Sequence, residues 1–269
     1  NYIFNGNVLN TTQTSRINVT KRFLNLPITI SASAGYNQNF RTGLTDIRLP
    51  DMTVAVNQFY LFKPKTGVRT GLLENINVNT GFALSNYVTT TEDQLFKQQM
   101  WQDLKTGAKN NISLSTNTTL AKFFTFSLSA NADNVLTTKT LEKSFNPVTN
   151  VIDNVYNNGI AAYSTFSTSA SLQTILYGQK NFGKKSPIVA SRHMMTPSFS
   201  FTYSPDFGAR SWGYYRDYAN ARGEITPYSI FEGGIYGAPS TGLTQSLGFN
   251  IANNIEMKVK SKSDSTGVK

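Results

Sequence analysis

The chain has 269 residues and a formal net charge of +10, and only 15% of its residues are charged against 39% that are apolar. Soluble domains carry about 25% charged residues, so this composition argues against an ordinary soluble surface. The 18 Phe and 13 Tyr argue against disorder, and the lack of cysteine excludes disulfides and thiolate metal sites. The positive charge favours an anionic partner, and because the usual DNA- and RNA-reading motifs are missing, we expect no nucleic acid.

Small polar residues alternate with apolar or aromatic residues along most of the chain. Residues 196–203 read Thr-Pro-Ser-Phe-Ser-Phe-Thr-Tyr, and residues 124–133 keep the same period of two. Such alternation puts apolar side chains on one face of a strand and polar side chains on the other. Strands of a transmembrane barrel need this pattern, because one face meets lipid and the other a wet interior. No segment approaches the roughly 20 apolar residues of a membrane-spanning helix.

The alternating segments predict about ten strands. In chain order they are residues 2–10, 15–23, 27–39, 44–61, 72–88, 107–118, 122–140, 159–178, 188–205 and 241–260. No linker or change of composition divides residues 1–269 into domains. We therefore predict an all-β fold, a transmembrane antiparallel up-and-down β-barrel of which about ten strands are present.

The predicted connections alternate in length. Those at 24–26, 62–71, 119–121 and 179–187 are short or moderate, and those at 40–43, 89–106, 141–158 and 206–240 tend to be longer. Outer-membrane barrels have short periplasmic turns and longer external loops, so the second group is predicted to be extracellular. Residues 92–104 have helical spacing, because Leu95, Phe96, Met100 and Leu104 can share one face.

Aromatic residues gather near the ends of the predicted strands, where a barrel carries two interfacial girdles. Aromatic residues also favour strands in general, so the girdle is a hypothesis. Its members are Phe23, Tyr60, Phe62, Phe123, Phe124, Tyr177 and Phe182 near the shorter turns, and Tyr36, Tyr87, Tyr203 and Phe207 near the longer loops.

The residues of catalytic and metal sites are scarce. His193 is the single histidine, so any scheme with a histidine base must use it. By parity with Phe199 and Phe201 it points outward, which favours an interfacial role, and no acidic residues cluster beside it at metal-ligand spacing. The glycines of residues 228–242 match no phosphate-binding motif, so this segment is predicted to be a loop that folds back on the barrel. We expect neither catalysis nor a metal or cofactor.

A stretch of 17 residues carries a family resemblance. Residues 192–208 read Arg-His-Met-Met-Thr-Pro-Ser-Phe-Ser-Phe-Thr-Tyr-Ser-Pro-Asp-Phe-Gly. This segment resembles the Arg-His-x-x-Thr-Pro-Ser-x-Ser-Phe-x-Tyr-x-Pro-Asp-Phe-Gly motif of the LPS-assembly outer-membrane protein family LptD, in its Bacteroidota form. Segments 212–215, 228–242 and 247–260 resemble the same family in the same order, as do residues 49–52 with 57–60. The first 180 residues agree mainly in pattern and spacing.

The resemblance implies an outer-membrane barrel that receives lipopolysaccharide from a periplasmic Lpt bridge. It further implies a lipoprotein plug of the LptE type and release through a lateral gate into the outer-membrane lipids. Family members carry an N-terminal jellyroll domain and further strands, so residues 1–269 are expected to be part of one outer-membrane β-barrel domain. The chain starts in mid-pattern without a signal peptide, which predicts a cleaved signal or an internal piece.

Transport of a lipid with a phosphorylated head group would need a cationic wet path. Arg192 points to the lumen by parity, and further basic residues gather at the shorter turns. The candidate lumen or anion contacts are Arg192, Lys184, Lys185, Lys63, Lys65 and Arg69. For the lysines, solvated turn charges or contacts with inner-leaflet head groups are at least as good an interpretation.

Three other classes of protein fit parts of the pattern. A porin or substrate-specific outer-membrane channel shares the alternation, the girdles and the loops. A soluble all-β adhesin or repeat protein would extract without detergent and would not have apolar outward positions. An enzymatic barrel is the weakest alternative, because it would depend on His193.

Overall fold

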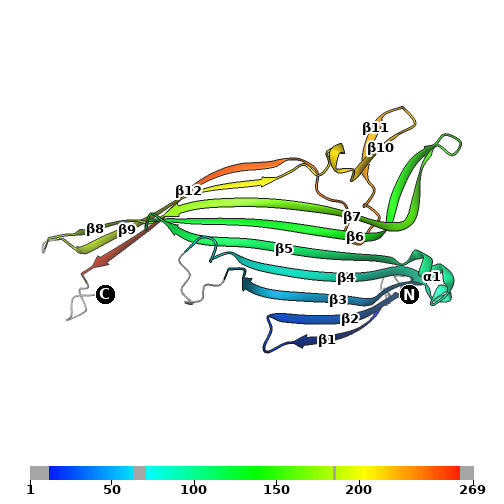
Figure 1. Cartoon of the computed structure of the whole chain (residues 1–269), viewed down its shortest axis with the longest axis horizontal. Helices are drawn as coiled ribbons and strands as arrows, with labels where there is room; N and C mark the ends of the chain where they lie inside the picture. Colours follow the sequence, from blue (N-terminus) through cyan, green and yellow to red (C-terminus); the bar gives the residue numbers. More distant parts are fainter. Residues whose placement is uncertain (1–11, 63–70, 184–185, 261–269) are drawn as a thin grey trace, which may run out of the picture.

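The computed structural model describes residues 12–62, 71–183 and 186–260. Ten strands of this part form one sheet, and neighbours in the sheet follow the order of the chain (Figure 1). The strands are β1 (Thr12–Arg22), β2 (Ile28–Asn39), β3 (Leu44–Tyr60), β4 (Asn77–Thr91), β5 (Lys105–Leu120), β6 (Phe124–Asn146), β7 (Val151–Thr174), β8 (Leu176–Asn181), β9 (Ile188–Ser204) and β12 (Thr244–Val259). All their pairings are antiparallel, which confirms the predicted all-β, up-and-down architecture of a barrel segment.

Nine of the predicted strands are observed, and the segment 2–10 lies outside the described residues. Several boundaries differ from the prediction by five residues or more. The predicted strand 72–88 begins only at Asn77, and the predicted strand 159–178 is divided between β7, which begins at Val151, and β8. β8 pairs with β9 beyond the end of β7, so β7 and β8 lie one after the other along the same side of β9.

The predicted loop 141–158 is wrong. β6 runs to Asn146 and β7 starts at Val151, so a four-residue turn joins two long strands. The Asn146 Oδ1 atom accepts hydrogen bonds from the backbone N–H groups of Val148 and Thr149, and Asn150 adopts a positive φ of 55°. An Asn side chain can accept hydrogen bonds from the backbone two or three residues on, and Asn also tolerates a positive φ, so the chain reverses in a tight turn where a longer connection was predicted.

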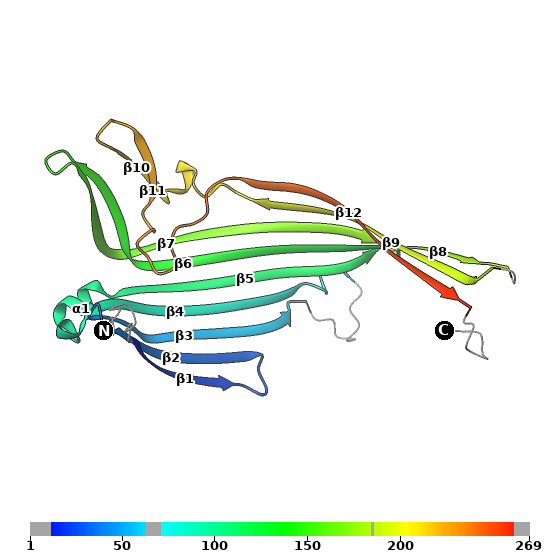
Figure 2. The ribbon, with the colours of Figure 1, turned by 180° about the vertical axis from the view of Figure 1, so that it is seen from behind.

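The strands connect alternately at two opposite ends of the sheet. We call the end with the connections 23–27, 61–76, 121–123 and 182–187 the turn end, and the other the loop end. The loop end carries the helix α1 (Gln98–Asp103), the β6–β7 turn and the hairpin of β10 (Tyr215–Ala219) and β11 (Ile225–Ser229), as Figures 1 and 2 show. Length alternates only in part, because 61–76 is long and 40–43 and 147–150 are short.

The sheet has two chemically different faces. Ser115 lies opposite Ser129, which lies opposite Ser169, and the Ser129 and Ser169 hydroxyls are 2.7 Å apart. We call this side the polar face. The next positions along the same strands pair Leu114 with Ala130, on the side that we call the apolar face. The register therefore places small polar residues in rows across one side of the sheet, as the period of two predicts.

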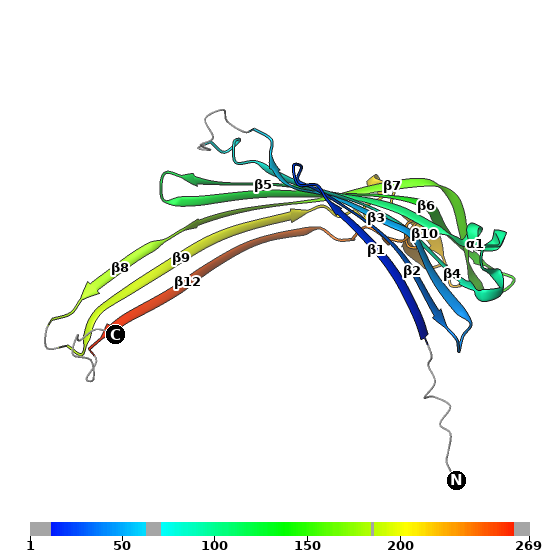
Figure 3. The same cartoon turned by 90° about the horizontal axis from the view of Figure 1, so that it is seen from below.

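Large apolar side chains are exposed along the apolar face. On β12 they include Leu247, which is 86% exposed, and Phe249, whose ring centroid lies 4.6 Å from that of Phe199 on β9. Soluble monomers rarely expose continuous apolar surfaces of this kind, whereas a lipid-facing surface requires one. Figure 3 shows that the sheet is curved rather than flat, as a segment of a barrel must be.

The segment 92–104 folds against the apolar face at the loop end, but not as one helix. A 3-10 turn (Glu92–Gln94) is separated from α1 at Phe96, which has a φ of 60°. Met100 is buried against Ile47 and Val88, with Leu95 and Leu104 packed around them. Phe96 is 70% exposed, so the prediction that it shares this face is wrong. No helix in the described ranges is long and apolar enough to cross a membrane.

The face assignment predicts opposite outcomes for two neighbouring substitutions on β6. Ala130→Arg puts a charge on the apolar face, where it should cost about 2–4 kcal/mol near the bilayer centre and reduce the folded protein recovered from membranes. Asn131→Arg puts the same charge on the polar face and should be tolerated. The measurement is the amount of folded, detergent-extracted protein. Equal recovery of the two variants would contradict the assignment.

Candidate functional site

Arg192 lies on the polar face, as its parity predicts. Its Nη1 atom is 4.0 Å from Glu256 Oε2 on β12, and its guanidinium lies 5.4 Å from the centre of the Tyr177 ring on β8. The arginine thus has an anionic and an aromatic neighbour, both of which hold it at the turn end. The other candidate contacts, Lys63, Lys65, Arg69, Lys184 and Lys185, lie outside the described residues and stay predictions.

The proposed girdle residues do not share one environment. Phe124 and Tyr203 lie on the apolar face, Tyr36 packs beside α1, and four residues are exposed near the turn end: Phe23, Phe62, Phe123 and Phe182. Tyr60, Tyr87 and Tyr177 lie on the polar face. Phe207 is only 1% exposed, because it packs against Phe166 and Trp212, so this ring has no surface to offer to lipid. A girdle made of the exposed rings stays a prediction.

His193 lies on the apolar face of β9, opposite Ile255. Its Nε2 atom is 3.0 Å from the side-chain oxygen of Asn253 on β12. Among the described residues no three acidic or histidine side chains come close enough to share a metal ion. His193 therefore faces outward, and its partner is the side-chain amide of Asn253.

The connection between β9 and β12, residues 205–243, folds onto the polar face, and we call it the inward loop. Phe231 is 2% exposed and packs against Val135 of β6 and Tyr163 of β7, with its ring centroid 4.7 Å from that of Tyr163. Tyr214 and Tyr236 pack around the same cluster. The prediction that residues 228–242 fold back on the barrel is therefore confirmed.

Tyr236 carries the inward loop across the sheet as far as β4. Its hydroxyl donates to the carbonyl oxygen of Ala83 over 3.3 Å. Its ring covers Gly107 on β5, where an added Cβ atom would lie 3.1 Å from the ring. A glycine at this position therefore lets the aromatic ring approach the backbone closely.

The inward loop also covers an edge that the sheet leaves open. β9 pairs with β7 only from Thr168 to Gln173, so within the described part of the chain no strand pairs with that side of β7 nearer the loop end. The Tyr214 hydroxyl accepts a hydrogen bond from the Ser164 N–H over 3.0 Å and lies 3.2 Å from the Ser164 carbonyl oxygen. A side chain thus satisfies backbone groups that a neighbouring strand would otherwise pair.

An ion pair fixes the inward loop to the long β6–β7 hairpin. The Lys143 ammonium donates to the Glu232 carboxylate, whose second oxygen accepts the Ser229 N–H over 3.1 Å. Burial raises the pKa of Glu232, but the hydrogen bonds from Lys143 and Ser229 and the charge of Lys143 outweigh burial. The pKa therefore lies below its ordinary value of 4.5.

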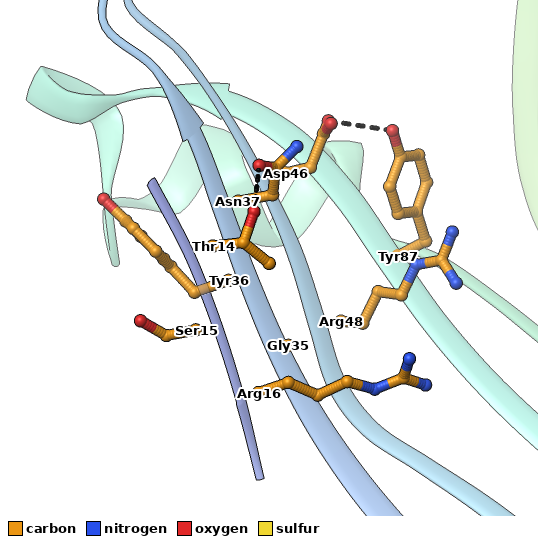
Figure 4. A pocket seen from close by; sticks show the side chains of 9 residues that line it. All are labelled: Thr14, Ser15, Arg16, Gly35, Tyr36, Asn37, Asp46, Arg48 and Tyr87. Atoms are coloured by element: carbon orange, nitrogen blue, oxygen red, sulfur yellow. Dashed lines mark hydrogen bonds between the residues drawn. The ribbon is translucent and has the colours of Figure 1, made fainter. Parts of the chain in front are cut away.

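A cavity of about 330 Å³ opens on the polar face of β1 to β4 (Figure 4). Arg16 of β1 and Arg48 of β3 lie in register on either side of Gly35 of β2. The Arg48 guanidinium lies 5.5 Å from the centre of the Tyr87 ring on β4. Neither arginine was among the residues indicated by the sequence, because their meeting depends on the register of three strands.

A second cavity, of about 390 Å³, lies between the sheet and the inward loop. Arg48 and Tyr87 line both cavities, and Lys105 of β5 and Tyr236 of the inward loop line the second. The two spaces are therefore neighbours along the polar face. Together they form a polar, cation-lined surface between β1 and the inward loop, which we take as the candidate site.

The buried ring of Phe231 is expected to hold the inward loop in place. Phe231→Ala should weaken docking by about 3 kcal/mol, the lower end for a buried Phe truncated to Ala. The readout is hydrogen exchange of the Leu141 N–H, which donates to the Ile230 carbonyl oxygen over 2.8 Å. Phe123→Ala removes a ring that is 74% exposed and is the matched control. Unchanged protection of Leu141 in Phe231→Ala would contradict this role.

The Lys143–Glu232 pair predicts that docking of the inward loop depends on pH. Because the folded pKa of Glu232 is lowered, its contribution is complete above the ordinary pKa of 4.5 and is lost as pH falls through the folded pKa. With Trp101→Phe, Trp212 is the remaining tryptophan and reports on the loop by fluorescence. The acid transition should disappear in Glu232→Gln, and a transition of equal size in that variant would refute the assignment.

The comparisons with known proteins agree with this architecture. The family described as LptD protein matches the chain over residues 1–269. Searches of curated proteins and of solved structures returned no match. The family match covers the strands of the sheet, the inward loop and both cavities. The chain therefore belongs to the LptD protein family.

Proposed function

We propose that this chain is part of an outer-membrane translocon that inserts lipopolysaccharide or lipooligosaccharide into the outer leaflet through a lateral gate. Membership of the LptD family carries the proposal, because this is a family of transport proteins that handle lipopolysaccharide. The two-faced sheet supports it physically. An apolar face can meet lipid, while the polar face offers hydroxyl, amide and cationic groups to a sugar head group.

The open edges of the sheet support a larger barrel domain. β1 and β12 each pair on one side only among the described residues. Within a bilayer every backbone N–H and C=O must be satisfied, so both edges need partners. We propose that residues 1–269 form part of one outer-membrane β-barrel domain whose remaining strands complete the pairing, with an N-terminal jellyroll domain facing the periplasm.

We place the loop end outside the cell and the turn end in the periplasm. The loop end carries α1, the β10–β11 hairpin and the inward loop, which is the distribution of external loops in outer-membrane barrels. Arg192 at the turn end would then face the side on which a periplasmic Lpt bridge delivers its lipid. A lipoprotein plug of the LptE type would occupy the lumen of the complete barrel.

A porin or substrate-specific outer-membrane channel is the second candidate. The cation-lined cavities favour it in part, because an anion-selective channel also needs a polar, positively charged interior. Such a protein would conduct small solutes across a bilayer. The family match favours lipid transport over this alternative.

Depletion of the protein in its own cells tests the proposal. Surface lipopolysaccharide should fall while newly made lipopolysaccharide accumulates inside, because the last transfer step is missing. The readouts are antibody labelling of intact cells and fractionation, with re-expression of the wild-type protein as the control. Normal surface lipopolysaccharide after depletion would contradict the transport function. Steady conductance of the purified protein in planar bilayers would then support the channel function.

A further inference from the structure

The cavity at the loop end brings two arginines to one space. Arg16 and Arg48 lie in register on either side of Gly35, and neighbouring strands are about 4.8 Å apart, so the two backbones lie about 10 Å from each other. Gly35 has no side chain, and an added Cβ atom would lie 3.9 Å from the Cβ atom of Arg48. Figure 4 shows the Arg16 side chain reaching past Gly35 and the Arg48 side chain extending toward Tyr87. Glycine at the central position leaves the gap between them open.

Asp46 is the acidic residue in the lining of this cavity, and its carboxylate is already engaged. Asp46 Oδ1 accepts a hydrogen bond from the Tyr87 hydroxyl at 2.8 Å (Figure 4) and another from the Thr89 hydroxyl at 2.7 Å. The ion pairs of the described residues involve neither Arg16 nor Arg48. Two positive charges therefore border the cavity without a carboxylate partner, and both side chains are exposed to it.

We propose that this cavity binds a phosphate group carried on the head group of a glycolipid. The proposal rests on the transport function argued above and assigns one step of it to named residues. Guanidinium forks bind phosphate with paired N–H donors, and two forks can hold one phosphate from two sides. The Tyr87 ring under Arg48 restricts that guanidinium. A volume of about 330 Å³ lies within the range of about 300–1,000 Å³ for small-ligand sites.

The site differs from the anion contacts that the sequence indicated. Arg192 lies at the turn end beside Glu256, whereas Arg16 and Arg48 lie toward the loop end and are in none of the ion pairs of the described residues. A head group that travels along the polar face from the turn end to the loop end would meet this pair late. The cavity therefore fits a holding site before release better than an entry site.

Binding to the full protein in detergent tests the proposal, with lipid A that carries two phosphates as the probe and calorimetry as the readout. Arg16→Gln and Arg48→Gln should each weaken binding about tenfold, the effect of losing one strong charged hydrogen-bond pair. Arg48→Lys keeps the charge but loses the fork, so it should weaken binding less than Arg48→Gln. Arg41→Gln removes the same charge from the exposed turn 40–43 beside the site and is the matched control.

Two further probes identify the source of the phosphate. The same lipid stripped of its phosphates should bind equally to the wild type and both Gln variants. Inorganic phosphate should compete only far above the lipid concentration. If it competes at similar concentrations, the cavity is a site for free phosphate and the head-group assignment is overturned.

Unchanged lipid affinity in both folded Gln variants would also overturn the proposal, whatever the depletion experiment shows about transport. Circular dichroism of each variant establishes that it is folded. If depletion lowers surface lipopolysaccharide but the lipid affinity of both Gln variants is unchanged, only the phosphate site is contradicted. Normal surface lipopolysaccharide would sink the transport function instead, so the two failures are distinguishable.

Discussion

The pairing of backbone groups in a membrane constrains everything else in this structure. Lipid offers no hydrogen-bond partners, so each strand must pair fully, and only the alternation of side chains decides what meets lipid. A shift of β6 by one residue against β5 would move Ala130 to the polar face and its neighbours Ser129 and Asn131 into lipid. The hydrogen-bonded rows of the polar face, such as Ser129 with Ser169, oppose that shift. The same register aligns Arg16, Gly35 and Arg48, so the cavity at the loop end depends on it.

The inward loop docks where the alternation fails. Val135 and Tyr163 occupy polar-face positions, yet they are apolar and aromatic, and Phe231 buries both. An apolar residue on the wet face has a cost unless protein covers it, so such an exception marks a docking point. The loop also brings Tyr214 to the uncovered backbone of Ser164. The inward loop therefore covers the apolar residues on the polar face and also supplies hydrogen-bond partners to the unpaired edge of β7.

The strands were predictable from sequence because a period of two survives wherever one face is buried in lipid. The ends of strands were not, since a turn such as 147–150 depends on the local conformations of Asn146 and Asn150 rather than on hydrophobic pattern. The break of the helix at Phe96 likewise follows from packing of Met100 on Ile47 and Val88, which are distant in sequence. The inward loop was predicted to fold back, but its partners were not, because they lie on four different strands. Arg16 and Arg48 were missed because their meeting requires the register of three strands.

The net charge of the chain does not by itself tell where an anion would bind on the polar face. The chain carries +10, but cations are paired at several points of the polar face, such as Lys109 with Asp133 at 3.1 Å and Arg192 with Glu256. Exposed pairs of this kind contribute about 0–1 kcal/mol each, yet they cancel the local field. What distinguishes the cavity of β1 to β4 is that hydroxyl groups, rather than arginines, satisfy Asp46. Because hydroxyl groups donate to this carboxylate and neither arginine is in an ion pair of the described residues, both guanidinium groups can meet another anion. The place where a phosphorylated head group would bind therefore depends less on the number of basic residues than on whether nearby acidic residues pair with them.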